Sequence, residues 1–258
     1  MKNIIKFIVF FASAIIMIVS CSGKKSSSSS SNETIVIATS SWTAAYAEAA
    51  GAANITVLAP FEMEHPSEYE LRPVDISKLM KADIIIYAGY EVMTERLKKG
   101  LDIPQEKLLL VSTDYSYAAI EKSILSIAAR LGTESVAREN LSDIRHTFDE
   151  GRKAVSEKNI SQRPIIAHRF QSSLVSELGL VPVVVFGPAS PEASAIANVS
   201  KIQAPLIIDN IHNPVGQPFK EVSPNALHIQ LLNFPGMKDT RTLIDVIKYN
   251  VDRIISDQ

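Results

Sequence analysis

The stretch that decides the fold is residues 134–158, ESVARENLSDIRHTFDEGRKAVSEK. Its apolar residues recur at helical spacing, as do those of the preceding segment, residues 118–131. Gly132 followed by Thr133 predicts the end of one helix and the cap of the next. The second helix would span roughly 35 Å at about 1.5 Å per residue, enough to run along the side of two domains.

Strand and helix signals alternate on both sides of this helix. Before it, we expect strands at 34–39, 54–59, 82–89 and 108–111, and helices at 44–53 and 75–81. After it, we expect strands at 165–167, 181–186, 205–208 and 227–232, and helices at 170–178, 191–202 and 240–256. Apolar strands that alternate with helices predict mainly parallel sheets covered on both faces. The predicted fold class is therefore α/β, with two lobes joined by a long rigid helix and a ligand cleft between them.

The N-terminus, MKNIIKFIVFFASAIIMIVSC, places two lysines before an apolar run and small or β-branched residues before Cys21, the single cysteine of the chain. This order is typical of a bacterial lipoprotein signal, in which Cys21 is acylated and becomes the new N-terminus. The alternative is an uncleaved transmembrane anchor, because the apolar run is near the lower limit for crossing a bilayer. With Cys21 committed to lipid, no disulfide is expected.

A serine run at residues 26–31 predicts a flexible tether, because such a composition buries no apolar area. We therefore divide the chain into a signal peptide (1–21), a tether (22–32), an N-terminal α/β lobe (33–132), a linker helix (133–160) and a C-terminal α/β lobe (161–258). The location predicted is extracytoplasmic, in the periplasm or at the cell surface, with the protein held on a membrane by its lipid.

Composition and motifs exclude several functions. The net charge is −2 and no basic stripe with interleaved aromatic residues occurs, so nucleic acid is not an expected partner. The sequence has no Gly-x-Ser-x-Gly elbow, P-loop or Rossmann glycine pattern, and its carboxylates are scattered. We expect a binding protein, a monomer, and no enzyme activity.

Several segments resemble the TroA-like family (cluster A-I), the metal-binding solute receptors of bacterial ABC importers. In the first half, the similar features in family order are Glu64-His65, then Tyr69-Glu70-Leu71-Arg72-Pro73-Val74-Asp75, then the strand that runs from Ala82-Asp83 to Gly89, and the nearby Glu91. In the second half they are Ile165-Ile166-Ala167-His168-Arg169-Phe170, followed by Leu178-Gly179-Leu180. The Glu-His pair and Leu-Arg-Pro-x-Asp look most like the zinc-uptake branch. The resemblance implies a class III periplasmic-binding-protein-like fold.

The chain departs from the family at two ligand positions. The segment Thr113-Asp114-Tyr115-Ser116-Tyr117 has no histidine where an Asp-Pro-His-x-Trp motif usually supplies one, and Asn233-Phe234-Pro235 follows the last strand where the family has an aspartate. Relative to the common spacing in the family, two extra residues lie between His65 and Tyr69, and the histidine-rich acidic loop of many zinc receptors is absent. The ligand set is therefore degenerate.

The resemblance implies a metal site between the lobes, with His65 and His168 as ligands, one from each lobe. Asp209 closes a strand at the cleft-facing end and is a third candidate, although Asp-Asn is also typical turn chemistry. Glu64 beside His65 is a fourth candidate, and His212 is an alternative for the missing ring.

The function that this implies is capture of a divalent transition metal, Zn²⁺ first and Mn²⁺ next, and its delivery to an ABC permease. One alternative is a receptor for a metal chelate or corrinoid, with a cleft lined by Trp42, Tyr90, Tyr115, Tyr117, Arg169 and Phe170. Another is a divergent surface lipoprotein that acts through protein contacts.

Overall fold

The structure is a computed structural model that describes residues 34–256 of the 258-residue chain. The signal, the lipidated Cys21 and the tether predicted for the N-terminus lie outside the described residues. From Thr34 onward the chain forms one compact unit. The predicted boundaries inside this unit, at 132/133 and 160/161, stay a prediction.

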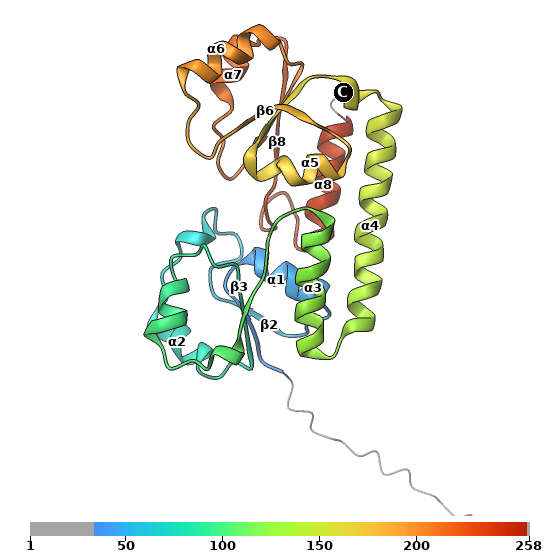
Figure 1. The fold of residues 1–258 in the computed structure, drawn as a ribbon. Coiled ribbons are helices and arrows are strands. Elements are labelled where there is room, and N and C mark those ends of the chain that lie inside the picture. Colours follow the sequence, from blue (N-terminus) through green and yellow to red (C-terminus); the bar gives the residue numbers. More distant parts are fainter. Residues whose placement is uncertain (1–33, 257–258) are drawn as a thin grey trace, which may run out of the picture. The chain divides into compact units, whose positions relative to one another are not determined.

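Strands and helices alternate along this unit, as predicted (Figure 1). The strands are β1 (Val36–Ala38), β2 (Ile55–Val57), β3 (Ile84–Tyr87), β4 (Leu108–Leu110), β5 (Ile165–His168), β6 (Pro182–Phe186), β7 (Leu206–Asn210) and β8 (Leu227–Leu231). The α-helices are α1 (Ser41–Ala49), α2 (Pro73–Leu79), α3 (Tyr117–Leu131), α4 (Glu134–Glu157), α5 (Ser172–Glu177), α6 (Ala193–Ile202), α7 (Gln217–Val222) and α8 (Leu243–Ser256). Short helical turns occur at Pro66–Glu68, Arg96–Gly100, Gln105–Lys107, Ile160–Gln162 and Arg169–Gln171.

The strands form two four-stranded sheets with the orders β2-β1-β3-β4 and β6-β5-β7-β8. Every pairing within them is parallel. We call the part built on the first sheet the N-lobe and the part built on the second the C-lobe. The predicted fold class, two parallel-sheet α/β lobes, is confirmed. Because parallel strands end at the same edge of a sheet, the loops that follow them gather at one end of each lobe.

Alternate residues of the central strands enter different cores, because successive side chains of a strand point to opposite faces. Val36 of β1 and Ile165 of β5 belong to one large apolar cluster, which also takes its residues from α1, α3, α4 and α8. Their neighbours Ile37 and Ile166 belong to two smaller clusters, one in each lobe. The large cluster is therefore the core that both lobes share.

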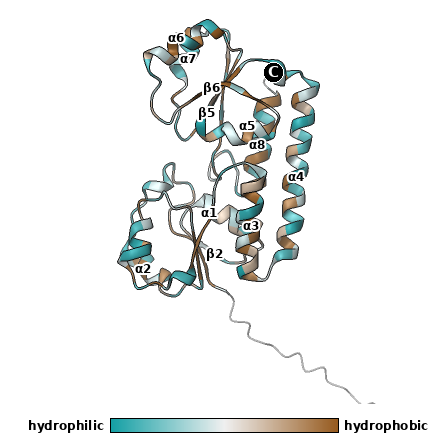
Figure 2. Cartoon of the chain, viewed as in Figure 1, coloured by the Kyte–Doolittle hydropathy of each residue, from teal (hydrophilic) through white to brown (hydrophobic). Residues whose placement is uncertain are grey.

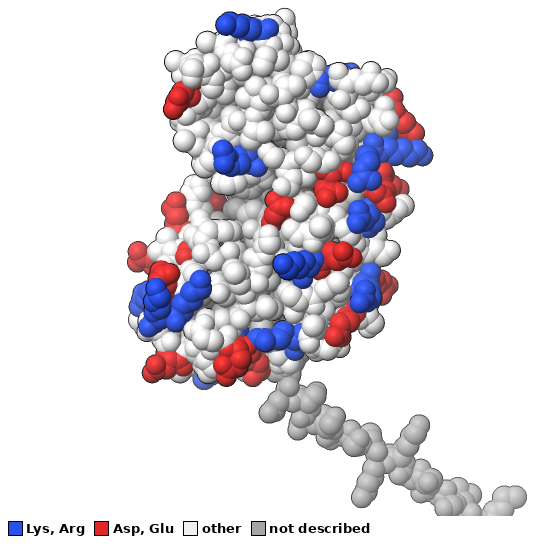
Figure 3. All heavy atoms as spheres, in the orientation of Figure 1, with Lys and Arg blue, Asp and Glu red and all other residues white. Residues whose placement is uncertain are grey.

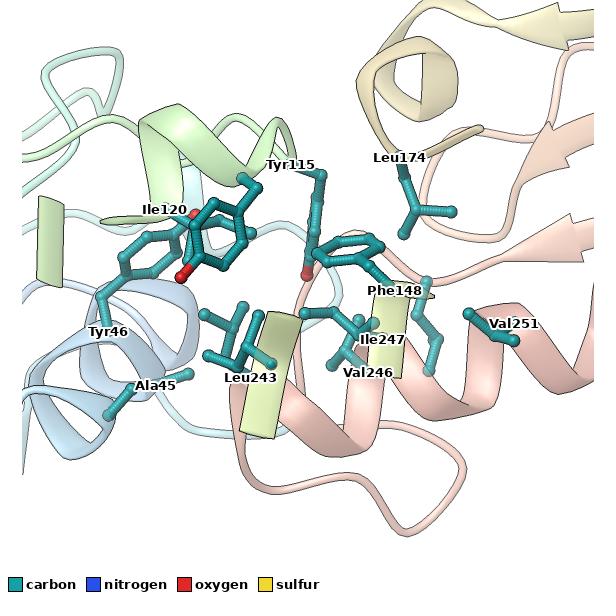
Figure 4. Packing of buried hydrophobic residues seen from close by; sticks show 14 of the residues in the cluster. Ala45, Tyr46, Tyr115, Ile120, Phe148, Leu174, Leu243, Val246, Ile247 and Val251 are labelled. Atoms are coloured by element: carbon teal, nitrogen blue, oxygen red, sulfur yellow. The ribbon is translucent and has the colours of Figure 1, made fainter. Parts of the chain in front are cut away.

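The long helix α4 is joined by α8, which packs along it, and by α3 (Figure 1). Helix α4 is largely hydrophilic and buries a narrow stripe, whereas α8 carries more apolar surface (Figure 2). In the packed layer, Phe148 of α4 lies beside Val246 and Ile247 of α8, with Tyr46 towards one lobe and Leu174 towards the other (Figure 4). The C-terminal helix, which follows the C-lobe sheet, also contacts α1 of the N-lobe. The connection between the lobes is thus a helical layer, and more than the single helix that the sequence predicts.

Several predicted boundaries shift. Helix α1 begins at Ser41 rather than at residue 44, because Ser40 and Thr43 form a capping box. Helix α8 begins at Leu243 rather than at residue 240. The carboxylate of Asp245, in its first turn, accepts hydrogen bonds from the backbone amides of Arg241 and Thr242 and so caps the helix. Helix α7 was not expected from the sequence, since six residues carry too little periodicity to be recognised.

Candidate functional site

The boundary between the lobes is formed by segments that follow strand ends. On the N-lobe side these are the start of α1, the loop after β2 and the segment that joins β4 to α3. On the C-lobe side they are the loops after β7 and β8. The face shown in Figure 3 is hollowed between the two lobes, and charged side chains are sparser on the C-lobe.

The two segments that depart from the family pattern, residues 113–117 and 233–235, meet each other. The Tyr115 hydroxyl donates to the backbone oxygen of Asn233 at 2.7 Å. The side-chain oxygen of Asn233 accepts from Gln171 Nε2, also at 2.7 Å. Both Tyr115 and Asn233 are buried. A direct hydrogen bond between the lobes thus joins the two segments in which the resemblance leads one to expect metal ligands.

His168 is fully buried inside the C-lobe, between the rings of Phe170 and Phe186. Its Nδ1 accepts the backbone N–H of Phe170 at 3.1 Å, so the neutral ring carries its hydrogen on Nε2. That atom faces Gly187, where an added Cβ would lie only 2.3 Å away. Burial lowers the pKa of His168, although Asp209 and Asn213 oppose this, which favours the neutral ring. In this arrangement His168 offers no lone pair to an ion.

Asp209 is also fully buried, and its carboxylate is occupied by protein groups. Oδ1 accepts from the backbone of Asn210 at 2.8 Å, and Oδ2 accepts from Gly216 N at 2.8 Å and lies 3.1 Å from His228 Nε2. These bonds hold the turn after β7. The geometry therefore agrees with the turn-forming alternative for Asp209 rather than with a metal ligand.

Glu91, part of the resemblance, has an organising role. Its carboxylate accepts from Thr39 Oγ1 at 2.6 Å and from the backbone amides of Ala88 and Gly89 at 2.8 and 2.6 Å. It is almost completely buried. Glu91 therefore ties the end of β1 to the end of β3 and positions the loops of the N-lobe.

His65 affects the pKa of His212, whereas it is not among the groups that shift the pKa of His168. His65 and Glu64 are exposed in the loop after β2, whereas His212 is buried in the loop after β7. Burial lowers the pKa of His212 to about 4, and the neighbouring His65 adds to the shift. Its Nδ1 accepts the backbone N–H of Asn233 at 3.3 Å, so its Nε2 carries the hydrogen. That Nε2 is buried and has no hydrogen-bond partner among residues 34–256.

Aromatic rings from both lobes meet around His212. The Trp42 ring of α1 lies 5.6 Å from Phe234, 5.9 Å from Tyr115 and 6.5 Å from Tyr90 between centroids. The ring of His212 stacks on Phe234 at 3.8 Å. We call these five residues, Trp42, Tyr90, Tyr115, His212 and Phe234, the boundary cluster. The indole N–H of Trp42 is buried and, within the described part of the chain, has no acceptor.

Sequence reasoning found part of this cluster. It singled out Trp42, Tyr90 and Tyr115, but it missed the role of Phe234, for which an aromatic residue directly after a strand end was the available signal. The other aromatic candidates lie elsewhere: the Tyr117 ring packs under Arg145, and Phe170 packs on His168.

A cavity of about 250 Å³ lies beside the boundary, lined by Phe61, Glu62, Gly236 and residues 238–241. Gly236 has φ +126°, and a Cβ there would lie 2.5 Å from the backbone oxygen of Phe61. Glycine is thus needed for this close approach of loops from the two lobes.

The four predicted ligands, His65, His168, Asp209 and Glu64, do not form one cluster. Across residues 34–256 there is no group of three or more His, Cys, Asp or Glu side chains that could hold a metal ion. The physical reason is that the carboxylate of Asp209 and Nδ1 of His168 are bound by protein groups, while Glu64 and His65 lie exposed in the other lobe.

Solved structures of metal-binding proteins have the same architecture. An Mn-bound periplasmic metal binding protein from Candidatus Liberibacter asiaticus matches with TM-score 0.63 and 15% identity over 87% of this chain and 99% of that chain. The chain has the fold of these proteins.

Two further structures agree. FpvC of P. aeruginosa in complex with Ni²⁺ gives TM-score 0.64 at 17% identity, over 86% of this chain and 96% of that one. The laminin binding protein Lmb of Streptococcus agalactiae, a bifunctional protein with adhesin and metal transporting activity, gives a TM-score of 0.65 at 12% identity, over 86% of this chain and 98% of that one. No protein-family model and no curated protein sequence matches the chain. Identities this low show the fold alone.

No helix between residues 34 and 256 is long and apolar enough to cross a bilayer.

Proposed function

We propose that the protein is an extracytoplasmic solute-binding lipoprotein of an ABC importer, with a divalent transition metal as its cargo. Zinc is the first candidate and manganese the second. The observation that carries the proposal is a two-lobed fold that solved metal-binding proteins share, with an exposed histidine, His65, in the N-lobe loop that follows β2. Imidazole suits zinc and nickel better than it suits hard, oxygen-preferring cations.

Membrane attachment belongs to the same proposal. The sequence around Cys21 supports a lipid anchor, and the serine run at 26–31 supports a spacer between membrane and receptor. A receptor held in this way would meet an ABC permease in the plane of the membrane and pass its cargo to it.

The test is zinc binding by the full chain, solubilised in mild detergent and purified without chelator. We expect one equivalent of zinc with micromolar or tighter affinity, and a loss of at least about tenfold in His65→Ala, because one coordinating nitrogen is removed. His146→Ala is the matched control, since that histidine is exposed on α4. Calorimetric titration that detects binding of neither zinc nor manganese, as the free ion or as a complex, would overturn the proposal.

A further inference from the structure

The side chains at the lobe boundary supply fewer ligands than a zinc ion usually takes. Zinc takes about four nitrogen, oxygen or sulfur ligands. Within residues 34–256, however, the chain gathers no three candidate ligands at one point. The oxygen of the Asn233 side chain is already bound by Gln171, and the hydroxyl of Tyr115 is bound to the Asn233 backbone. Most of the coordination sphere must come from outside the protein.

The same boundary holds two buried N–H groups that lack acceptors in the described part of the chain, Trp42 Nε1 and His212 Nε2. The histidine presents a hydrogen there because its Nδ1 accepts the backbone of Asn233. Both rings contact Phe234, so both donors belong to one cluster. A buried donor without a partner costs about 1 to 3 kcal/mol, which a ligand oxygen would relieve.

Aromatic faces complete this environment. Trp42, Tyr90 and Phe234 offer apolar surface, and 55% of Tyr90 is exposed at the rim. Such walls suit the carbon skeleton of an organic ligand and contribute nothing to a naked cation's coordination. The boundary has few coordinating atoms, two N–H donors without acceptors in the described residues, and aromatic walls. These features suit a small anionic chelator with a bound metal ion.

We propose that the cargo enters as a metal complex of a small, oxygen-rich chelator. Oxygens of the chelator accept hydrogen bonds from Trp42 and His212, and an open position of the metal takes His65. Both donors are buried in this structure, so the chelate reaches them when the lobes part at the boundary cluster. This inference rests on the proposed function and names the form in which its metal is bound.

The experiment compares three probes on the full chain in detergent: Zn²⁺ alone, nitrilotriacetate alone and the 1:1 zinc nitrilotriacetate complex. The complex leaves room for an imidazole at the metal and presents carboxylate oxygens. Trp42 is the single tryptophan of the chain, so its emission reports binding at the boundary itself. We expect the complex to bind at least about tenfold more tightly than zinc alone, because it supplies both the ligands and the acceptors that the site lacks.

Two variants remove the donors while keeping an aromatic ring, Trp42→Phe and His212→Phe. Each should weaken the complex about tenfold, the effect of one hydrogen bond to a charged acceptor. Circular dichroism checks that each variant folds, and titration calorimetry replaces fluorescence for Trp42→Phe. His146→Phe, on the exposed face of α4, is the matched control and should bind like the native chain.

The outcomes separate the two proposals. If free zinc binds as tightly as the complex, or if both folded donor variants keep full affinity for it, the chelate inference is wrong and the metal receptor stands. Nitrilotriacetate alone binding as well as its zinc complex would also overturn the inference, because the site would then select the anion. If neither zinc nor manganese binds in free or chelated form, the proposed function itself fails.

Discussion

The chemistry of each histidine depends on which ring nitrogen the backbone already uses. His168 and His212 both accept a peptide N–H on Nδ1, from Phe170 and Asn233. Each neutral ring then carries its hydrogen on Nε2 and acts as a donor there. The sequence predicts His168 as a metal ligand because of its position after a strand. Because its Nδ1 accepts the Phe170 N–H, its Nε2 carries the hydrogen and has no lone pair for an ion. His65 makes a different case because it is exposed.

The buried ring of His212 predicts a pH dependence of stability. Its pKa is lowered from 6.5 to about 4 in the folded protein, so between these values the unfolded chain binds a proton that the folded chain does not. The free energy of unfolding should therefore fall as the pH falls, by roughly 2 kcal/mol from about pH 7 to about pH 5 for this group. Urea denaturation at several pH values measures it.

The His212→Phe variant should lose that part of the pH dependence, because a phenyl ring keeps the stack on Phe234 and cannot be protonated. The remaining slope belongs to other groups, including His168, whose pKa is lowered in the same direction. His146→Phe on the exposed face of α4 is the control. Equal slopes in His212→Phe and the native chain would contradict the prediction.

At the scale of elements, α4 packs closely on its neighbours at Gly151. A Cβ added there would lie 2.8 Å from Leu178 Cδ2 and 3.0 Å from Val251 Cγ1 of α8. Glycine costs helix stability in isolation, by about 1 kcal/mol relative to alanine. Its presence in the middle of this helix is explained by the close approach of α4 to the C-lobe and to α8.

We expect Gly151→Leu to lower the free energy of unfolding by more than about 2 kcal/mol, because the new side chain overfills a packed interface. The matched control is Lys153→Leu, two residues along α4 at a position where 76% of the side chain is exposed. That change should stay within about 0.5 kcal/mol of the native chain. Urea denaturation compares them, and a loss of similar size in both variants would mean that contact at Gly151 is not the cause.

At the scale of the whole molecule, the lobes are joined by the helical layer and by the segment that links β4 to α3. Besides the Tyr115 bond to Asn233, this segment contacts α5: the backbone N–H of Tyr117 donates to Glu177 at 2.8 Å, and Ser173 donates to the carboxylate of Asp114. A layer of α3, α4 and α8 with a shared core resists large domain rotations. Opening at the boundary cluster is therefore expected to be a small tilt.

Tyr115→Phe tests the bond between the lobes. It leaves the buried oxygen of Asn233 without this donor, so we expect a loss of about 1 to 2 kcal/mol in urea denaturation and faster hydrogen exchange in the segment before α3. Tyr90→Phe is the control for stability, because its hydroxyl makes a long contact of 3.3 Å to Thr113 at the exposed rim. Equal stability of Tyr115→Phe and the native chain would show that the bond does not hold the lobes together.

The sequence by itself determined the alternation of strands and helices along the chain, the long helix and hence the two-lobed α/β fold. These depend on local periodicity and on burial of apolar faces, which can be read from neighbouring residues such as those of β5 and α4. It also selected Trp42 and Tyr115 as residues that could line the cleft, and His65 as a candidate ligand on a loop. Which side chains meet there was decided only by the tertiary structure. Whether Asp209 binds Gly216 or an ion, and whether Tyr115 reaches Asn233, depends on distances between residues remote in the chain, and no local pattern encodes those distances.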